Sequence, residues 1–274
     1  MRKKLEVLKK KLEEYKKVVI AYSAGVDSSF LLKVAIDTLG RENVIAVTAY
    51  SDFTSEEDIY YAEDAKSDKE LRYIRIPIEI LDVPGVKENP IDRCYICKKA
   101  IFSKIIEEIN KIEGSYCVIC EGSNADDLSD YRPGRRAIEE LGIKSPLLES
   151  GLTKKEIRAL SKELGIRTHD RPSKACLVSR IAYGQEITKE MLKAVDKAEQ
   201  FLISKGYDNV RVRVHGTAPN VIARIEVPKD KISEVVNILG LAEYFEQLGF
   251  AYVTVDLNGF KSGSMNKAIG IKNE

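Results

Sequence analysis

Three cysteines lie where their neighbours could make them reactive. Cys94 and Cys97 form a Cys-x-x-Cys pair in "NPIDRCYICKK", and Cys176 lies in "RPSKACLVSR" beside Lys174 and Arg180. Nearby positive charge and a helix start favour the thiolate, which is the form of cysteine that binds metals and attacks electrophiles. A Cys-x-x-Cys pair fits a redox dithiol, half of a zinc site or part of an iron–sulfur cluster. The three thiols therefore mark candidate chemistry of more than one kind.

A set of three thiols has one ligand too few for the usual metal sites. An iron–sulfur cluster of four irons needs four ligands, so three cysteines would leave one iron open to a further ligand such as sulfide. A structural zinc site normally takes four protein ligands, and His169 is the one residue that offers itself as the fourth. Cys94 and Cys97 could also act as a reductant pair for Cys176. Core packing of Cys176 is the remaining alternative.

The other two cysteines, Cys117 and Cys120, have the same spacing but a different context. They lie in "YCVIC", an apolar run that predicts a buried strand. Residues three apart in a strand face opposite sides of the sheet, so the two sulfurs cannot easily bind one metal. Since cysteine is also a common core residue, we predict that both fill the core.

A polar turn between an apolar strand and a helix predicts a phosphate-binding loop. In "VVIAYSAGVDSSFLLKVA" the backbone N–H groups of the turn and the helix N-terminus can bind an anion. A carboxylate at Asp27 suits Mg²⁺ carried on pyrophosphate better than bare phosphate. The alternative is an ordinary N-terminal cap of the helix. The candidate phosphate-binding residues are Ser23, Ala24, Gly25, Val26, Asp27, Ser28 and Ser29.

The elements around these residues predict an α/β fold with two domains. Apolar strands at 18–22, 43–50, 71–78 and 116–120 alternate with helices at 1–16, 28–40, 55–68 and 96–111. Such alternation is typical of a doubly wound parallel sheet, which binds ligands beyond the carboxyl ends of its strands. A smaller α+β pattern follows, with helices at 188–206 and 229–240 and strands at 209–216, 221–228 and 250–260. We predict domains at 1–170 and 171–274, with Cys176 near their junction.

Two further groups of polar residues are candidate ligand contacts. A loop after the strand 116–120 carries polar and acidic residues where the nucleotide is expected, and the alternative for each is a helix cap. Its members are Asn124, Asp126, Asp127, Asp130 and Arg132. Arg211 and Arg213 alternate along a strand and therefore share a face, which suits a phosphate or a carboxylate. Their alternative is a solvated face paired with Glu226 or Asp256.

Composition narrows the class of protein. The formal net charge is +1, from 44 basic and 43 acidic residues, so no general attraction to nucleic acid is built in. The N-terminus lacks the apolar stretch of a signal peptide, and no run is long enough to span a membrane, so we expect a cytoplasmic protein. Five cysteines in a reducing compartment argue against a disulfide framework.

The polar turn closely resembles the SGGxDS signature of the PP-loop ATP pyrophosphatases, with Ala24 where glycine is usual, a change that we expect the turn to tolerate. The blocks "EGSNADDLSDYRPGRRAIEELGIKSPLLESGLTKKEIRALSKELG", "RPSKACLVSRIAYG" and "VTVDLNGFKSGSMN" resemble the LarE-type sulfur transferases. This resemblance covers nearly the whole chain. It implies a PP-loop (HUP-like) fold, with ATP and Mg²⁺ as cofactors.

The resemblance also implies a reaction. ATP adenylates a carboxylate of pyridinium-3,5-biscarboxylic acid mononucleotide, sulfur replaces the oxygen, and AMP and pyrophosphate are released, in biosynthesis of a nickel-pincer cofactor. In one version of the family the cysteine that matches Cys176 gives up its own sulfur and becomes dehydroalanine. Members that also have a pair such as Cys94 and Cys97 look like a second version, in which three cysteines hold a [4Fe-4S] cluster with a hydrosulfide on the free iron. With all three cysteines present, we expect the cluster-dependent form.

Further expectations follow from the same resemblance. Gly122 is expected to let the chain approach the nucleotide, and Arg180 to meet the phosphate of AMP or of the substrate. Free sulfide or a sulfur-carrier protein would supply sulfur, and the protein is expected to form a homo-oligomer without membrane or nucleic-acid partners. A tRNA thiolase is the nearest alternative enzyme, disfavoured by the neutral charge and the lack of a four-cysteine zinc ribbon. A module that senses ATP and sulfide without turnover is the alternative from another class, and a plain amidotransferase leaves the cysteines unexplained.

Overall fold

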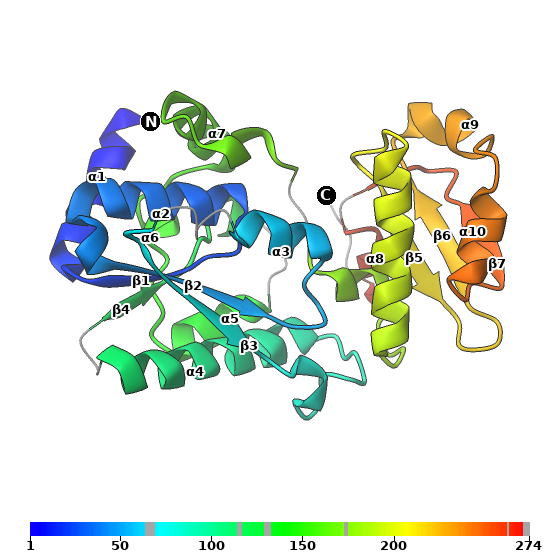
Figure 1. Ribbon diagram of the computed structural model, residues 1–274, viewed down its shortest axis with the longest axis horizontal. Helices are drawn as coiled ribbons and strands as arrows, with labels where there is room; N and C mark the ends of the chain where they lie inside the picture. Colours follow the sequence, from blue (N-terminus) through cyan, green and yellow to red (C-terminus); the bar gives the residue numbers. More distant parts are fainter. Residues whose placement is uncertain (64–68, 114–116, 129–132, 173–174, 262, 271–274) are drawn as a thin grey trace. The chain divides into compact units, whose positions relative to one another are not determined.

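The chain forms two compact units in the computed structural model (Figure 1). The first unit comprises residues 1–80 and 94–174, and the second comprises residues 81–93 and 175–274. The segment 81–93 was expected in the first domain, and the structure assigns it to the second unit. The structure describes residues 1–63, 69–113, 117–128, 133–172, 175–261 and 263–270.

A four-stranded parallel sheet forms the centre of the first unit, which confirms the predicted doubly wound fold. Its order is β3-β2-β1-β4, and each neighbouring pair is parallel. Because β2 and β3 extend to one side of β1 and β4 lies on the other, the strand order reverses at β1, where such sheets bind ligands. The strands are β1 (Val18–Ala21), β2 (Val44–Tyr50), β3 (Arg72–Pro77) and β4 (Val118–Cys120).

Helices cover both faces of this sheet, as the unbroken apolar sequence of β1 requires. Val18 and Ile20 pack into one core together with α1, α2 and α7, whereas Val19 packs into a second core with α4 and α5. Figure 1 shows these two groups of helices on opposite sides of the sheet. The helices of this unit are α1 (Arg2–Tyr15), α2 (Val26–Leu39), α3 (Glu56–Glu63), α4 (Arg93–Glu113), α5 (Gly134–Glu140), α6 (Pro146–Glu149) and α7 (Lys154–Glu163).

Several predicted boundaries were wrong, and three helices of this unit were not predicted. The helix expected at 96–111 begins earlier and ends later, at Arg93 and Glu113. Of the strand expected at 116–120, residue 116 lies outside the described residues and the strand comprises Val118–Cys120. The later part of the helix expected at 55–68 lies outside the described residues. Helices α5, α6 and α7 were not predicted, although the sequence carries a start signal for α7. Thr153 and Glu156 form a capping box there, each accepting a hydrogen bond from the other's backbone N–H.

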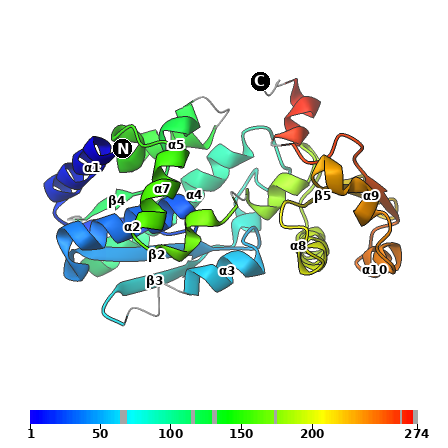
Figure 2. The ribbon, with the colours of Figure 1, turned by 90° about the horizontal axis from the view of Figure 1, so that it is seen from above.

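The second unit is an α+β domain around a mixed sheet of three strands. Strands β5 (Arg211–His215) and β6 (Ile222–Glu226) are antiparallel, and β7 (Tyr252–Val255) runs parallel to β6. Helix α8 (Lys189–Ser204) packs along β5, and Figure 2 views it nearly end-on. The single helix expected at 229–240 was wrong. The structure has a short α9 (Ile232–Val235) there, and residues 236–240 separate it from α10 (Leu241–Gln247), which begins after Gly240 in the left-handed conformation.

None of the helices in the described part of the chain is long and apolar enough to cross a membrane.

Candidate functional site

The turn between β1 and α2, which was predicted to bind phosphate, contains one strained residue. Ala24 has a φ of 55°, in the left-handed region, and its side chain is fully buried. For a residue with a side chain this conformation costs on the order of 1 kcal/mol, which explains why glycine suits the position. The change to alanine is accommodated, but with a backbone strain that the sequence analysis did not foresee.

Hydroxyl groups inside the turn hold its shape. The Ser28 hydroxyl accepts a hydrogen bond from the Ser23 N–H at 3.2 Å and donates one to the Gly25 carbonyl at 3.2 Å. The hydroxyls of Ser23 and Ser28 are 3.1 Å apart. The Ser29 hydroxyl is buried and has no hydrogen-bond partner within the described residues. Ser23 and Ser28 thus order the loop, and Ser29 has a donor left for another use.

A cavity of about 320 Å³ opens beside this loop, within the first unit. That volume lies at the lower end of the range for small-molecule sites. Polar groups from the phosphate loop and from the end of β4 line one part of it, namely Ser23, Gly25, Asp27, Ser28, Glu121, Gly122, Ser123 and Asp127. Apolar side chains from β1, β2 and α4 line another part, namely Ala21, Val47, Ala49, Ile101, Phe102 and Ile105.

Gly122 lets the end of β4 approach the phosphate loop. A Cβ atom at this position would lie 3.1 Å from the Ser28 backbone nitrogen and 3.4 Å from the Asp27 Cβ. A side chain here would therefore crowd one of the N–H groups at the start of α2. Gly122 therefore lies close to the loop itself. That it also lets the chain approach a nucleotide stays a prediction.

Asp27 is a half-buried carboxylate with a cationic partner that the sequence analysis missed. Its Oδ2 forms an ion pair with the Lys154 ammonium, and its Oδ1 is buried with no partner among the residues that the structure describes. Burial raises the pKa of Asp27 above its usual value, while the neighbouring Lys154 lowers it. The two residues are 127 positions apart, so no local pattern could have revealed the pair.

The polar loop after β4 makes the local contacts of a helix cap. Asn124 Oδ1 accepts from the Asp126 N–H at 3.0 Å, and Asp127 Oδ2 accepts from the Asn124 N–H at 3.0 Å. Asp126 Oδ2 accepts from the Lys154 N–H at 2.8 Å, so this loop also fixes the first residue of α7. Of the three, Asp127 lines the cavity. Asp130 and Arg132, from the same predicted set, lie outside the described residues.

The five cysteines differ in burial. Cys94 and Cys97 are half-buried near the start of α4, where a spacing of three places them on one face of the helix. Cys176 is exposed and immediately precedes a short 3₁₀ helix, Leu177–Arg180, in the second unit. Cys120 and Cys117 pack into the cores on opposite faces of the sheet, as predicted. Burial raises the pKa of the Cys120 thiol, so this sulfur is not a ready metal ligand.

No metal centre is assembled by the described side chains. Among them, no group of three or more histidine, cysteine, aspartate or glutamate residues could hold a metal ion. His169, the alternative fourth zinc ligand, is half-buried, and its Nδ1 lies 3.0 Å from the Ile166 carbonyl oxygen. That nitrogen is therefore occupied within its own turn.

Arg180 is an anchor for the backbone of Cys176. Its side chain is almost fully buried and forms a two-point ion pair with Glu199, at 2.9 and 2.8 Å. Its Nη1 donates to the carbonyl oxygens of Ala175, at 2.5 Å, and of Cys176, at 3.1 Å. The predicted contact with a phosphate stays a prediction, and the structure adds a role in holding the reactive segment.

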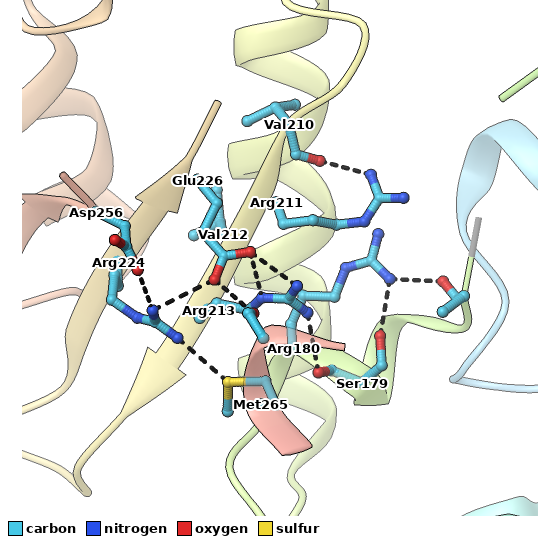
Figure 3. A network of polar contacts seen from close by, with 12 residues as sticks. Ser179, Arg180, Val210, Arg211, Val212, Arg213, Arg224, Glu226, Asp256 and Met265 are labelled. Atoms are coloured by element: carbon cyan, nitrogen blue, oxygen red, sulfur yellow. Dashed lines mark hydrogen bonds and ion pairs between the residues drawn. The ribbon is translucent and has the colours of Figure 1, made fainter. Parts of the chain in front are cut away.

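Arg211 and Arg213 lie inside the second unit rather than on a solvated strand face (Figure 3). Arg213 donates to Glu226 Oε2 through Nε at 3.0 Å and through Nη2 at 2.8 Å, and Glu226 is fully buried. Arg211 donates to the Val210 carbonyl at 2.6 Å. Burial, followed by repulsion from Arg180, lowers the pKa of Arg211 to about 10.

The arginine cluster is defined as Arg180, Arg211, Arg213 and Arg224. Glu199 pairs with Arg180, Glu226 pairs with Arg213 and Arg224, and Asp256 pairs with Arg224. His215 borders the cluster and accepts from Arg224 Nε at 3.0 Å, and burial together with Arg224 lowers the pKa of this histidine. The neutral imidazole therefore adds no charge to the cluster, whose guanidinium groups are of the kind that recognises anions.

The parallel sheet and the phosphate loop define the class of PP-loop nucleotide-binding proteins. A family model for NAD synthase matches residues 1–84. The chain is 36% identical over 94% of its length to the pyridinium-3,5-bisthiocarboxylic acid mononucleotide synthase of Lactiplantibacillus plantarum, of which it covers 92%. Uncharacterized proteins of Synechocystis and Methanocaldococcus jannaschii are 39% and 35% identical, over 97% and 95% of the chain and 98% of each relative. The chain belongs to the LarE-type family of PP-loop proteins and is an ATP-using enzyme.

Replacing Ala24 by glycine tests the strain in the phosphate loop. Relief of the left-handed strain offsets the lost buried methyl group, so we expect the free energy of unfolding of Ala24→Gly to stay within about 1 kcal/mol of the parent. The matched control is Ala35→Gly, a fully buried alanine inside α2. It should lose about 2 kcal/mol, because helix propensity and burial both suffer. Urea denaturation gives both values, and equal losses in the two variants would contradict the strain.

Replacing Lys154 by methionine tests the charge of Asp27. Without the ammonium that lowers its pKa, the Asp27 carboxyl should stay protonated to a higher pH, and a neutral carboxyl is a poor ligand for Mg²⁺. The acid limb of the pH profile of kcat/KM for ATP should therefore move to higher pH. Lys33→Met, which removes an exposed ion pair with Asp37 on the same α2 helix, should leave the profile in place. An unmoved limb in Lys154→Met would show that Asp27 does not need this partner.

Proposed function

We propose that this protein is an ATP-dependent sulfurtransferase that acts on a pyridinium mononucleotide in nickel-pincer cofactor biosynthesis. The observation that carries the proposal is a cavity beside a PP-loop, in a chain 36% identical to a synthase named for the bisthiocarboxylic acid mononucleotide. Sulfur must replace oxygen in a carboxylate to give a thiocarboxylate, and a carboxylate oxygen leaves only after activation. ATP provides that activation through adenylation.

The cavity suits ATP in one orientation. Its apolar part would hold the adenine, and the N–H groups at the start of α2 would bind the β and γ phosphates. The unpartnered Oδ1 of Asp27 fits a Mg²⁺ ion on those phosphates, with Asp127 beside it in the same lining. The substrate carboxylate oxygen would then attack the α phosphorus, forming the acyl adenylate while the bond to the pyrophosphate oxygen breaks.

Lys154 would serve the same step. In the absence of nucleotide its ammonium neutralises Asp27. A divalent cation on Asp27 would replace that neutralising charge, and the ammonium would become available to the phosphate oxygens. The Asp126 contact to the Lys154 backbone keeps the start of α7 in place during this change.

The arginine cluster would bind the substrate's anionic groups. A mononucleotide with two carboxylates carries both kinds of anion that guanidinium groups recognise. Arg211 is the member with the lowered pKa, because it is buried near Arg180 and Arg213, and an arriving anion would relieve this repulsion. Glu199 and Glu226 hold Arg180 and Arg213 in fixed orientations, so the cluster is preorganised.

The thiols present fit a three-cysteine iron–sulfur cluster by their chemistry. Cys94 and Cys97 share one helix face and are half-buried, and Cys176 is exposed on a segment that Arg180 anchors. We propose these three as the ligands of a [4Fe-4S] cluster, which when bound would supply sulfide sulfur for the activated carboxyl carbon. Arg180 and Glu199 would hold the Cys176 backbone in position, and AMP would leave with the carboxylate oxygen.

A direct assay tests the proposed reaction. The protein is mixed anaerobically with Mg-ATP, sulfide and pyridinium-3,5-biscarboxylic acid mononucleotide, and pyrophosphate and the mass of the organic product are measured. We expect substrate-dependent pyrophosphate release and a thiocarboxylate, both reduced about 100-fold or more in Asp27→Asn because the metal ligand is lost. Asp37→Asn, on the exposed face of the same helix, is the control. Pyrophosphate release at the same rate with and without the substrate, or a product without sulfur, would refute the proposal.

Counting iron and acid-labile sulfide tests the source of sulfur. We expect about four irons per chain in the anaerobic parent protein, lost in both Cys94→Ala and Cys176→Ala. Cys117→Ala removes a sulfur that packs against the core and should retain the cluster. A parent that binds no iron, and whose Cys176 loses the elements of H₂S during one turnover, would show instead the single-turnover version of the reaction.

A further inference from the structure

Arg171 joins three separate parts of the first unit, and no pattern in the sequence singled it out. It is buried, and its Nη1 donates to the Ala24 carbonyl oxygen in the phosphate loop at 2.9 Å. Its Nη2 donates to Asp58 Oδ1 on α3 at 2.7 Å. The guanidinium carbon lies 4.1 Å from the centre of the Tyr61 ring, on the same helix. One side chain therefore connects the loop after β1, the helix after β2 and the segment after α7.

The contact with the Ala24 carbonyl bears on anion binding. The peptide bond is planar and trans, so the Ala24 carbonyl and the Gly25 N–H point in opposite directions. Fixing the oxygen therefore fixes the direction of the N–H, and Gly25 lines the cavity. Ala24 holds a strained left-handed φ of 55°, which persists only where the surroundings enforce it. The Arg171 hydrogen bond is such an enforcing contact.

Arg171 is itself held on several sides. The Arg158 side chain of α7 donates to the His169 and Arg171 carbonyl oxygens, both at 2.7 Å. Pro172 follows, and a residue before proline favours the extended backbone that Arg171 adopts, with φ −55° and ψ 128°. Asp58 also accepts from the Ser55 hydroxyl at 2.8 Å, so the carboxylate is fixed as well. This support makes the guanidinium a preorganised donor.

We propose that Arg171 is a positioning residue that holds the phosphate loop in its anion-binding conformation before ATP arrives. The proposal rests on the binding of ATP phosphates at the loop, as in the proposed function. It differs from a general stabilising role in one respect. A loop that loses its preset N–H direction binds the pyrophosphate part of ATP less well, while the apolar part of the cavity is unchanged.

Calorimetric titration of Arg171→Met with Mg-ATP, pyrophosphate and AMP separates these roles. We expect the affinities for ATP and pyrophosphate to fall about tenfold, as for one charge-assisted contact, and that for AMP to change less than about threefold. Arg171→Lys should recover part of the loss. Arg75→Met is a matched control, because Arg75 pairs with Glu63 of the same α3 helix and lies 4.6 Å from the Tyr50 ring centre. It should bind all three ligands like the parent.

Two results would overturn the proposal. In one, Arg171→Met melts at a lower temperature but binds ATP and pyrophosphate like the parent. In the other, the affinity of Arg171→Met for AMP falls as much as its affinity for ATP. If Arg171→Met does not fold, Asp58→Asn decides, because a selective loss of ATP and pyrophosphate affinity supports the proposal and unchanged affinity refutes it. The titrations need no sulfur chemistry. A parent protein that binds ATP but makes no thiocarboxylate would therefore refute the proposed function without affecting the proposal for Arg171.

Discussion

A turn that binds phosphate through its backbone must present N–H groups that no side chain covers and no other acceptor uses. Between β1 and α2 this constraint determines residues far apart in the chain. Ala24 adopts a strained φ, and Gly122 keeps the end of β4 clear of the Ser28 nitrogen. Arg171 donates a hydrogen bond to the Ala24 carbonyl oxygen. Each is separated from the others by tens of residues or more. The fold of the first unit brings them together because β1 and β4 are neighbours and α7 packs on the same face as α2.

Charged side chains in both units are held in place by partners of opposite charge. In the first unit Lys154 satisfies one oxygen of Asp27 and leaves the other without a partner among the described atoms. In the second unit Glu199, Glu226 and Asp256 orient the guanidinium groups of Arg180, Arg213 and Arg224. A buried oxygen without a hydrogen-bond partner is costly in the interior, so it persists where a ligand can complete it.

Sequence patterns were sufficient for the parallel sheet, the phosphate loop and the opposite-facing pair Cys117 and Cys120. Each of these depends on local periodicity: an apolar β-branched run, a polar turn before a helix, and the two-residue repeat of a strand. Lys154 and Arg171 were missed because their partners, Asp27 and Ala24, lie 127 and 147 residues away. Arg211 and Arg213 were placed on one face, but the sequence did not reveal that both are buried or that Arg213 pairs with Glu226 on the neighbouring strand β6. The helix expected at 229–240 was wrong because α9 ends at Val235, after which the N–H groups of Asn237 and Ile238 bond to carbonyl oxygens three residues back, as in turns.

Arg180 donates to the carbonyl oxygens of the two peptide bonds that flank Cys176, while the cysteine side chain itself is exposed. With the backbone held, the sulfur can move mainly by rotation about one bond, which has three staggered positions. Ordering such a side chain costs little conformational entropy compared with ordering a whole loop. The thiol can therefore change between an outward and a bound position with a small change in entropy, and its reach from the chain stays short in every position.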